Sequence, residues 1–304
     1  MNVLVTGATG FVGAALIPRL QAAGHTVRAY ARRSDAVAAG VEVVQGDAVA
    51  GTRLDEALDG IDCAYYLIHS MEPSLDGTFA DRDRRAASHF GEAARAAGVG
   101  RVVYLGGLVP EGKEASMHLA SRLEVERLLR DAAPASVALR ASIVIGARSR
   151  SFRFLVRLVE RVPVMALPAW RTYRTQPIDA RDVLAFLVAA ATTEHARGGL
   201  SLDIAGPDVV TYEGLVHRIR DAMLLRRPAL RLQFNLMPVA SRVAAAIAGE
   251  SVELVGPLME GLDGDLLPRD DSAAALLGVR LHRLDAAIER ALREWEAVEE
   301  LAAR

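Results

Sequence analysis

The glycine-rich stretch after the first apolar run constrains this fold more than any other feature of the chain. The run "NVLVTGA" is continuously apolar and ends in glycine, which is typical of a strand buried on both faces. Gly7, Gly10 and Gly13 follow at three-residue spacing, and a helical pattern covers residues 11–23. A glycine pattern at the junction of a first strand and a first helix indicates a dinucleotide-binding loop.

Each glycine has a separate task in such a loop. Gly7 permits the tight turn, Gly10 lets the backbone approach a pyrophosphate, and Gly13 allows close packing of the helix on the strand. The helix start adds unpaired N–H groups and partial positive charge for the phosphates. The predicted cofactor contacts in this loop are Gly7, Thr9, Gly10, Phe11, Val12 and Gly13.

Strand and helix patterns alternate through the first 146 residues. The further predicted strands are "TVRAYA", "VEVVQGD", "DCAYYLIH", "RVVYLGG" and "SVALRASIVIG". Helical patterns separate them, among them residues 79–97 and the stretch "MHLASRLEV". Strands that alternate with helices of this length predict right-handed βαβ units and an α/β fold with a doubly wound parallel sheet of the Rossmann type.

The pattern changes after Gly146 and predicts a smaller, mostly helical C-terminal lobe. Proline-punctuated loop follows one amphipathic helix, and "PIDARDVLAFLVAAAT" returns to strand and helix with Asp179 as N-cap. "LSLDIAG" is a further strand pattern. We therefore predict a dinucleotide-binding domain of residues 1–150 with 177–206 returning to it, and a substrate lobe of residues 151–176 and 207–304.

Composition excludes several classes of function. The net charge of −2 does not indicate binding to nucleic acid, which usually requires an excess of basic residues. Cys63 is the only cysteine, so no intramolecular disulfide can form, which fits a reducing cytoplasm. The chain begins without a leader pattern, and its longest uncharged apolar run, residues 183–191, is shorter than the roughly 20 residues that cross a bilayer. We expect a cytoplasmic protein without stable membrane insertion.

Two further sequence features favour structural roles. The helix of residues 152–162 has arginines on one face, but Glu160 interrupts them, and we expect a lobe helix over the site rather than a membrane-surface helix. His217 and His282 have no partners at metal-ligand spacing, so we predict no metal site.

Two arginines at the end of the second strand bear on the cofactor. An acid at this place, about 20 residues past the loop, would select NAD. Arg32 and Arg33 stand there instead, and guanidinium groups suit the 2′-phosphate of NADP. We predict NADP as the cofactor.

The glycine spacing G-x-x-G-x-x-G, the pair Gly46–Asp47 after the third strand and "VVYLGG" in the fifth resemble the short-chain dehydrogenase/reductase superfamily. The stretches "AYYLIHSM", "DRDRRAA", "LGGL", "SRLEVERLLR" and "QPIDARDVLAFL" resemble its atypical NAD(P)H-binding branch, near NmrA-like and complex-I-accessory-subunit-like proteins. The resemblance spans about residues 1–205. It implies a Rossmann fold with NADP(H) in a cleft and a variable C-terminal lobe. The further cofactor contacts it implies are Asp47, Ala48, Leu67, His69, Gly106 and Arg122.

Reductases of this superfamily use Tyr-x-x-x-Lys on the helix after the fifth strand, and a serine at the end of that strand. The resemblance places His118 in the tyrosine position and Arg122 in the lysine position, with Gly106 or Gly107 at the serine. Lys113 is the only lysine, and Val109 lies four residues before it. The chain therefore departs from the family pattern at its catalytic pair.

Three interpretations of this pair stay open. In the first, Arg122 binds the nicotinamide ribose and His118 is a general acid. In the second, Arg122 binds the cofactor without proton transfer, and the protein is an NADP(H) sensor. In the third, both residues are structural.

Other polar residues offer alternatives. His69 and Ser70 follow the fourth strand at the edge where ligands bind in such sheets. Tyr173, Arg174 and Gln176 could face a substrate from the lobe. Leu119 and Leu123 lie on a flank of their helix and are expected in a homodimer interface or under the lobe.

The function predicted from the sequence is hydride transfer between NADPH and an apolar or quinone-like small molecule. The alternative is a non-catalytic NADP(H)-binding sensor, regulator or assembly factor.

Overall fold

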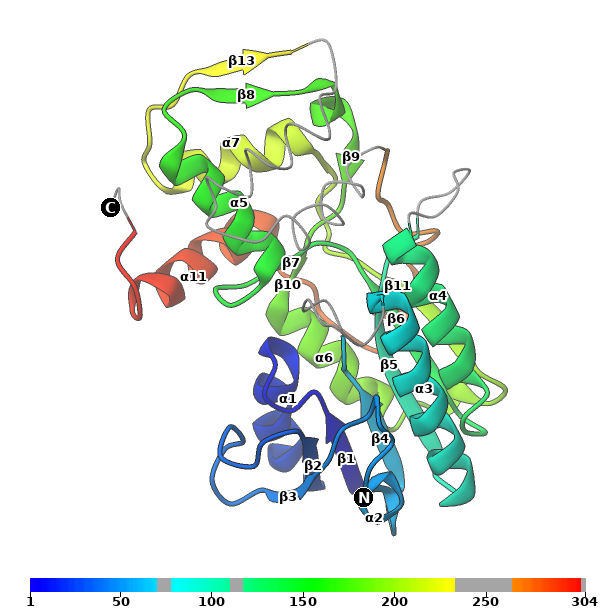
Figure 1. Cartoon of the computed structure of the whole chain (residues 1–304). Coiled ribbons are helices and arrows are strands. Elements are labelled where there is room, and N and C mark those ends of the chain that lie inside the picture. Colours follow the sequence, from blue (N-terminus) through cyan, green and yellow to red (C-terminus); the bar gives the residue numbers. More distant parts are fainter. Residues whose placement is uncertain (70–77, 110–116, 233–263, 302–304) are drawn as a thin grey trace.

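A seven-stranded parallel sheet forms the centre of the molecule in the computed structural model, which describes residues 1–69, 78–109, 117–232 and 264–301 (Figure 1). The strand order is β11-β6-β5-β4-β1-β2-β3. The strands are β1 (Asn2–Thr6), β2 (Thr26–Ala31), β3 (Glu42–Gln45), β4 (Cys63–Tyr66), β5 (Arg101–Gly107), β6 (Val137–Ala141) and β11 (Leu200–Ile204). The predicted Rossmann-type α/β fold with a parallel sheet is confirmed.

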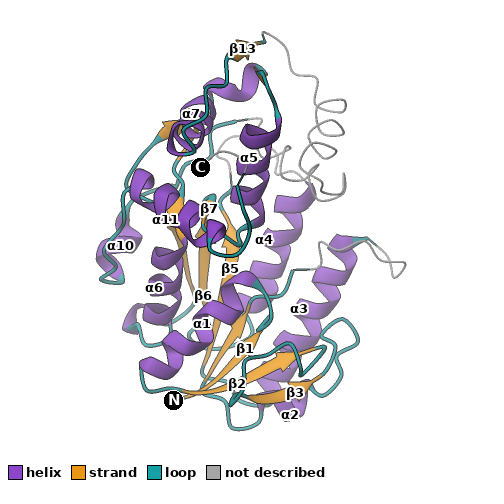
Figure 2. Cartoon of the chain, turned by 90° about the vertical axis from the view of Figure 1, so that its left-hand side faces the viewer, coloured by secondary structure: helices purple, strands orange, loops and turns teal. Residues whose placement is uncertain are grey.

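Helices cover both faces of this sheet (Figure 2). One face carries α1 (Phe11–Ala22) and α6 (Ala180–Ala190), and the other carries α2 (Leu54–Leu58), α3 (Phe79–Ala96) and α4 (Met117–Arg130). Val3 and Val5 of β1 pack into the first apolar core and Leu4 into the second. Both faces of the strand are buried, which explains why its sequence is continuously apolar rather than alternating.

A second group of elements packs above the carboxyl ends of the strands (Figure 1). Its helices are α5 (Arg150–Arg161), α7 (Tyr212–Ala222) and α11 (Leu284–Glu296), with the 3₁₀ turn Ala169–Thr172. The short α10 (Ser272–Leu276) and the 3₁₀ turn Glu194–Ala196 instead pack on the core of the main sheet through Ala273 and Ala196. Its strand pairs are β7 (Val144–Ile145) with β10 (Ile178–Asp179), β8 (Met165–Leu167) with β13 (Ala229–Arg231), and β9 (Arg174–Thr175) with β12 (Val210–Thr211). A separate apolar core centred on Phe152, Leu215 and Trp295 joins α5, α7 and α11. The domain boundaries given above stay a prediction.

The stretch "SVALRASIVIG" was expected as one strand, and this was wrong. It divides into β6, which belongs to the main sheet, and β7, which pairs with β10. The division follows the neighbouring strand, because β11 ends at Ile204 and the Ser142 N–H donates to the Ile204 carbonyl. Beyond that bond the chain has no partner strand in the main sheet and continues toward Ile178.

Helix ends agree with the expected capping residues. The Asp179 side chain accepts a hydrogen bond from the Arg181 N–H at the start of α6, so the predicted N-cap is confirmed.

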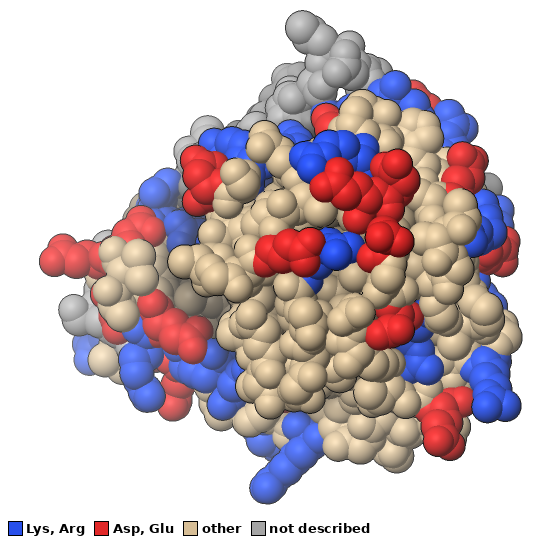
Figure 3. All heavy atoms as spheres, turned by 90° about the horizontal axis from the view of Figure 1, so that it is seen from below, with Lys and Arg blue, Asp and Glu red and all other residues tan. Residues whose placement is uncertain are grey.

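Across the ranges that the structure describes, no helix combines the length and the apolar character needed to cross a membrane. The face seen from below in Figure 3 carries acidic and basic side chains interspersed with uncharged ones.

Candidate functional site

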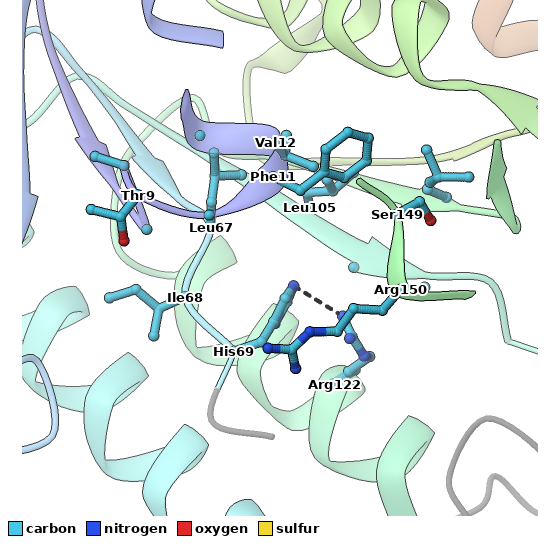
Figure 4. A pocket seen from close by; sticks show the side chains of 18 of the residues that line it. Thr9, Phe11, Val12, Leu67, Ile68, His69, Leu105, Arg122, Ser149 and Arg150 are labelled. Atoms are coloured by element: carbon cyan, nitrogen blue, oxygen red, sulfur yellow. Dashed lines mark hydrogen bonds between the residues drawn. The ribbon is translucent and has the colours of Figure 1, made fainter. Parts of the chain in front are cut away.

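A cleft of about 1220 Å³ opens at the carboxyl ends of β1, β4, β5 and β6 (Figure 4). It lies where the strand order reverses, since β1 pairs with β2 on one side and with β4 on the other. Ligands of open α/β sheets bind in the crevice at such a point. The walls come from the glycine loop, the ends of the central strands, α4 and the start of α5.

The glycine loop forms one end of this cleft and leaves no room for side chains. Gly7 has φ +65°, and a Cβ there would lie 2.5 Å from the Leu67 carbonyl oxygen. At Gly13 a Cβ would lie 2.3 Å from the Gly7 carbonyl oxygen. The first turn of α1 contains no acid, so its N–H groups and partial positive charge face the cleft without a competing carboxylate. The arrangement fits a bound pyrophosphate.

We expect Gly13→Ala to lower the free energy of unfolding by about 1–3 kcal/mol, the usual cost of overpacking, and to weaken dinucleotide binding by moving the loop. Gly91→Ala is the matched control, because a Cβ there would meet its nearest neighbour at 3.5 Å, an ordinary contact in helix α3. Urea unfolding and NADPH titration of both variants test this. An unchanged Gly13→Ala protein would contradict the tight loop.

The residues predicted to bind the cofactor are gathered around this cleft, with one exception. Those that line it are Gly7, Thr9, Gly10, Phe11, Val12, Gly13, Arg32, Asp47, Ala48, Leu67, His69, Gly106 and Arg122. Arg33 is exposed and is not among the lining residues. Their role in binding stays a prediction.

Arg122 and His69 meet across the floor of the cleft (Figure 4). The Arg122 Nη1 lies 3.2 Å from the His69 Nε2. Because a guanidinium only donates hydrogen bonds, this Nε2 accepts, and the neutral imidazole carries its proton on Nδ1. The bond joins the carboxyl end of β4 to α4 and holds a permanent positive charge beside the cleft.

The pair predicted from the family's Tyr-x-x-x-Lys pattern is described only in part. Arg122 lines the cleft and is half-buried. His118 belongs to α4, one turn before Arg122, but its side chain lies outside the described part of the structure, as does the whole of Ser70. Leu119, on the same helix, also lines the cleft.

The glycine in the family's serine position has a local explanation. A Cβ at Gly106 would lie 2.9 Å from the ring of Tyr104, so a serine there would require the ring to move. Tyr104 is buried, its hydroxyl donates to the Arg122 carbonyl at 3.3 Å, and burial raises its pKa to about 12. This phenol supports α4 and stays protonated at neutral pH.

The three lobe residues considered as substrate contacts do not line the described cleft. The Gln176 Nε2 donates to the Gly206 carbonyl at 2.7 Å, and Arg174 is ion-paired with Asp265 at 2.6 Å. Tyr173 directly follows the 3₁₀ turn Ala169–Thr172, and its N–H donates to the Trp170 carbonyl. Tyr212, which lines the cleft from the lobe, was not predicted.

Sequence reasoning also missed much of the basic lining. Arg82 and Arg85 reach the cleft from α3, and Arg148 and Arg150 reach it from the start of α5. Little in the sequence distinguishes these from the many other arginines, because their position depends on how α3 and α5 pack.

A parallel sheet with a glycine loop at its reversal point is typical of dinucleotide-binding proteins. The family model described as NAD(P)H-binding matches residues 7–144. The (4-alkanoyl-5-oxo-2,5-dihydrofuran-3-yl)methyl phosphate reductase of Streptomyces griseus is 30% identical over 303 residues, which cover 97% of this chain and 96% of that protein. The chain belongs to the short-chain dehydrogenase/reductase superfamily.

Other relatives agree with this assignment. The ceramide reductase of Caulobacter vibrioides is 29% identical over 195 residues, 63% of this chain and 61% of that protein. Among solved structures, the UDP-glucuronic acid 4-epimerase from Bacillus cereus in complex with UDP-glucuronic acid and NAD superposes with a TM-score of 0.73 at 17% identity, covering 98% of this chain and 100% of that one. At that identity the likeness shows the fold alone. The narrower NmrA-like placement stays a prediction.

Proposed function

We propose that this protein is an NADP(H)-dependent reductase that transfers a hydride between NADPH and a small carbonyl or quinone-like molecule with an apolar part. The observation that carries the proposal is the cleft itself. A phosphate-binding loop lies at one end, and the Arg122–His69 pair lies on the floor beyond it. When bound, the reduced nicotinamide supplies the hydride.

The residues of the chain divide the remaining tasks among them. The α1 start holds the pyrophosphate, and Arg32 holds the 2′-phosphate. Arg122 bonds the nicotinamide ribose in place of the family's lysine. His118, one turn earlier on α4, gives a proton to the substrate oxygen or carbon that becomes basic as the hydride arrives. His69 accepts from Arg122 and fixes the direction of its guanidinium.

The relative from Streptomyces griseus supports a carbonyl substrate. By its name, that enzyme reduces a methyl phosphate that carries an oxo-dihydrofuran ring and an alkanoyl chain. We propose that the substrates of this protein likewise contain a carbonyl group in a ring and an apolar chain. Leu67, Leu105 and Leu108 in the cleft wall supply apolar surface suited to such a chain.

The test is the consumption of NADPH by the purified protein with a panel of quinones and unsaturated carbonyl compounds. Turnover of at least one class supports a reductase. Tight NADPH binding without turnover of any member would instead support the sensor, regulator or assembly-factor alternative. Absence of nucleotide binding would reject both.

We expect NADPH to bind about ten to a hundred times more tightly than NADH, since one charged hydrogen bond contributes about 1.5–3 kcal/mol. Arg32→Ala should remove most of this difference. Arg33→Ala is the matched control, because Arg33 is a neighbouring exposed arginine outside the cleft lining. Calorimetry with both nucleotides measures the effect. Equal affinities in the parent protein would contradict the NADP assignment.

We also propose a cytoplasmic location and self-association through the α4 flank that carries Leu123, whereas Leu119 lines the cleft. Both leucines are half-buried in the single chain. Sedimentation of the parent protein and of Leu123→Glu tests the association.

A further inference from the structure

The charged lining of the cleft is almost entirely basic. The arginines that line it are Arg32, Arg82, Arg85, Arg122, Arg148 and Arg150. Among the lining residues that the structure describes, Asp47 alone is acidic. The whole chain has a net charge of −2, and the surface in Figure 3 mixes both signs. The positive charge is therefore concentrated in the cleft, where it attracts anions.

Two of these arginines, Arg148 and Arg150, come from the segment at the start of α5. In Figure 4, Thr9 of the loop lies on one side, Ser149 lies on the other, and Arg150 extends toward Arg122 and His69. The cofactor phosphates are served by the α1 start and by Arg32. The proposed function therefore assigns Arg148 and Arg150 no task in holding the pyrophosphate or the 2′-phosphate.

The start of α5 presents donors to the same side of the cleft. Arg148, Ser149, Arg150 and Ser151 all line it, and α5 has no acid in its first turn. Ser149 is the N-cap and is only 6% exposed, yet its side chain makes no capping hydrogen bond. The first-turn N–H groups of a helix have no partner within the helix, and with the helix dipole they favour an anion.

The pairing of the arginines changes along this segment. Arg153 and Arg157 are ion-paired with Glu299, and their guanidinium carbons lie 4.1 and 4.9 Å from the centre of the Trp295 ring. Arg148 and Arg150 form no ion pair with any carboxylate in the described ranges. The arginines of α5 that face the lobe are thus neutralised, while those at the cleft keep their charge for a ligand.

Ser142 gives an independent sign of a missing partner. It is 5% exposed, lines the cleft after β6, and its Oγ has no hydrogen-bond partner within the described part of the chain. Buried hydroxyl groups are nearly always hydrogen-bonded in native structures. A polar ligand group in the cleft would satisfy it.

The name of the Streptomyces griseus relative contains a phosphate ester. We infer that Arg148, Ser149, Arg150 and the first N–H groups of α5 form the subsite that binds a phosphate monoester group of the substrate. The tetrahedral oxygens of a phosphate accept from several directions, and guanidinium groups bind them through paired hydrogen bonds. Ser142, which lines the same cleft after β6, donates to the body of the substrate. The inference rests on the proposed function, because it assigns the phosphate to the molecule that is reduced.

The experiment titrates inorganic phosphate into the NADPH-saturated protein at constant ionic strength and follows the thermal unfolding midpoint. With the cofactor sites filled, phosphate should raise the midpoint saturably, and acetate should do so much less. Arg148→Ala and Arg150→Ala should each raise the apparent phosphate Kd about ten-fold. Arg150→Lys should have a smaller effect, and Ser149→Ala provides a variant without loss of charge.

Arg127→Ala is the matched control, because Arg127 is exposed on α4 and lies outside the cleft lining; it should leave phosphate binding unchanged. The NADPH Kd should stay the same in all variants. Equal effects of phosphate and acetate, or the same phosphate Kd in Arg148→Ala, Arg150→Ala and the parent, would overturn the subsite. A weaker NADPH complex in Arg150→Ala would assign that guanidinium to the cofactor and also overturn it. Failure of NADPH to bind would reject the proposed function separately.

Discussion

His118→Phe is expected to slow turnover by about a hundred-fold or more, the usual size of a lost proton donor, while leaving NADPH affinity nearly intact. Arg122→Met is expected to act differently and weaken NADPH binding itself. The difference follows from their places on α4: Arg122 lines the cleft and is bonded to His69, whereas His118 lies one helical turn earlier. Initial rates with a reducible substrate and nucleotide titrations separate the two effects.

The three interpretations of this pair give different results in the same measurements. A sensor shows no turnover to lose, yet Arg122→Met still weakens NADPH binding. A purely structural pair lowers thermal stability in both variants without changing nucleotide affinity. His195→Phe is the control, since His195 is exposed in the 3₁₀ turn Glu194–Ala196 and is not a cleft residue. Normal turnover in His118→Phe would remove the proposed proton donor.

The central sheet could be predicted from the sequence because its signals are local. Each strand such as "RVVYLGG" is a short apolar run, and β5 extends over the residues expected, Arg101–Gly107. The glycine loop could also be predicted from the sequence, because the tight turn at Gly7 and the close packing at Gly13 leave no room for a Cβ. These features depend on neighbours in the sequence or on a repeated strand–helix pattern.

The rest of the site depends on contacts between distant segments. His69 and Arg122 were each named from the sequence, but their hydrogen bond joins residues 53 positions apart. Arg148 and Arg150 enter the cleft only because α5 packs on α7 and α11 through the core around Trp295. In a chain with one lysine and many arginines, no local signal separates a ligand-binding arginine from one that pairs with Glu299. Such roles can be assigned only once the fold shows which segments lie together.

The ionic cluster at Asp179 shows the same limit and leads to the second large expected effect. Asp179 was predicted as an N-cap, but its side chain is fully buried and also bonds Arg181 at 2.7 Å and Arg290 of α11 at 2.9 Å. Burial alone would raise the pKa of this carboxyl, but hydrogen bonds from Arg181 and the charge of Arg290 lower it below its ordinary value. The carboxylate therefore links the start of α6 to α11.

Asp179→Asn is expected to lower the free energy of unfolding by about 3 kcal/mol, because Arg181 and Arg290 lose their buried carboxylate partner. Arg290 keeps its ion pair with Glu294. This loss is near the low end for breaking a buried ion pair, about 3–5 kcal/mol, because the Arg181 and Arg290 side chains are 31% and 21% exposed and retain some water. Asparagine still caps α6, so the loss comes from the charge. Asp285→Asn, which breaks an exposed pair with Arg218, is the control and should cost less than about 1 kcal/mol.

The difference between the parent protein and Asp179→Asn should also depend on pH. Because folding lowers the pKa of Asp179, its contribution is fully present above the unfolded value of about 3.9 and is lost as the pH falls through the lowered folded value. Urea unfolding of both proteins from about pH 7 down to the lowest pH at which they stay folded measures the gap. The gap should be constant at first and shrink only in the acid range. A gap that is negligible at neutral pH, or that grows on acidification, would show that the carboxylate does not hold α11 to α6.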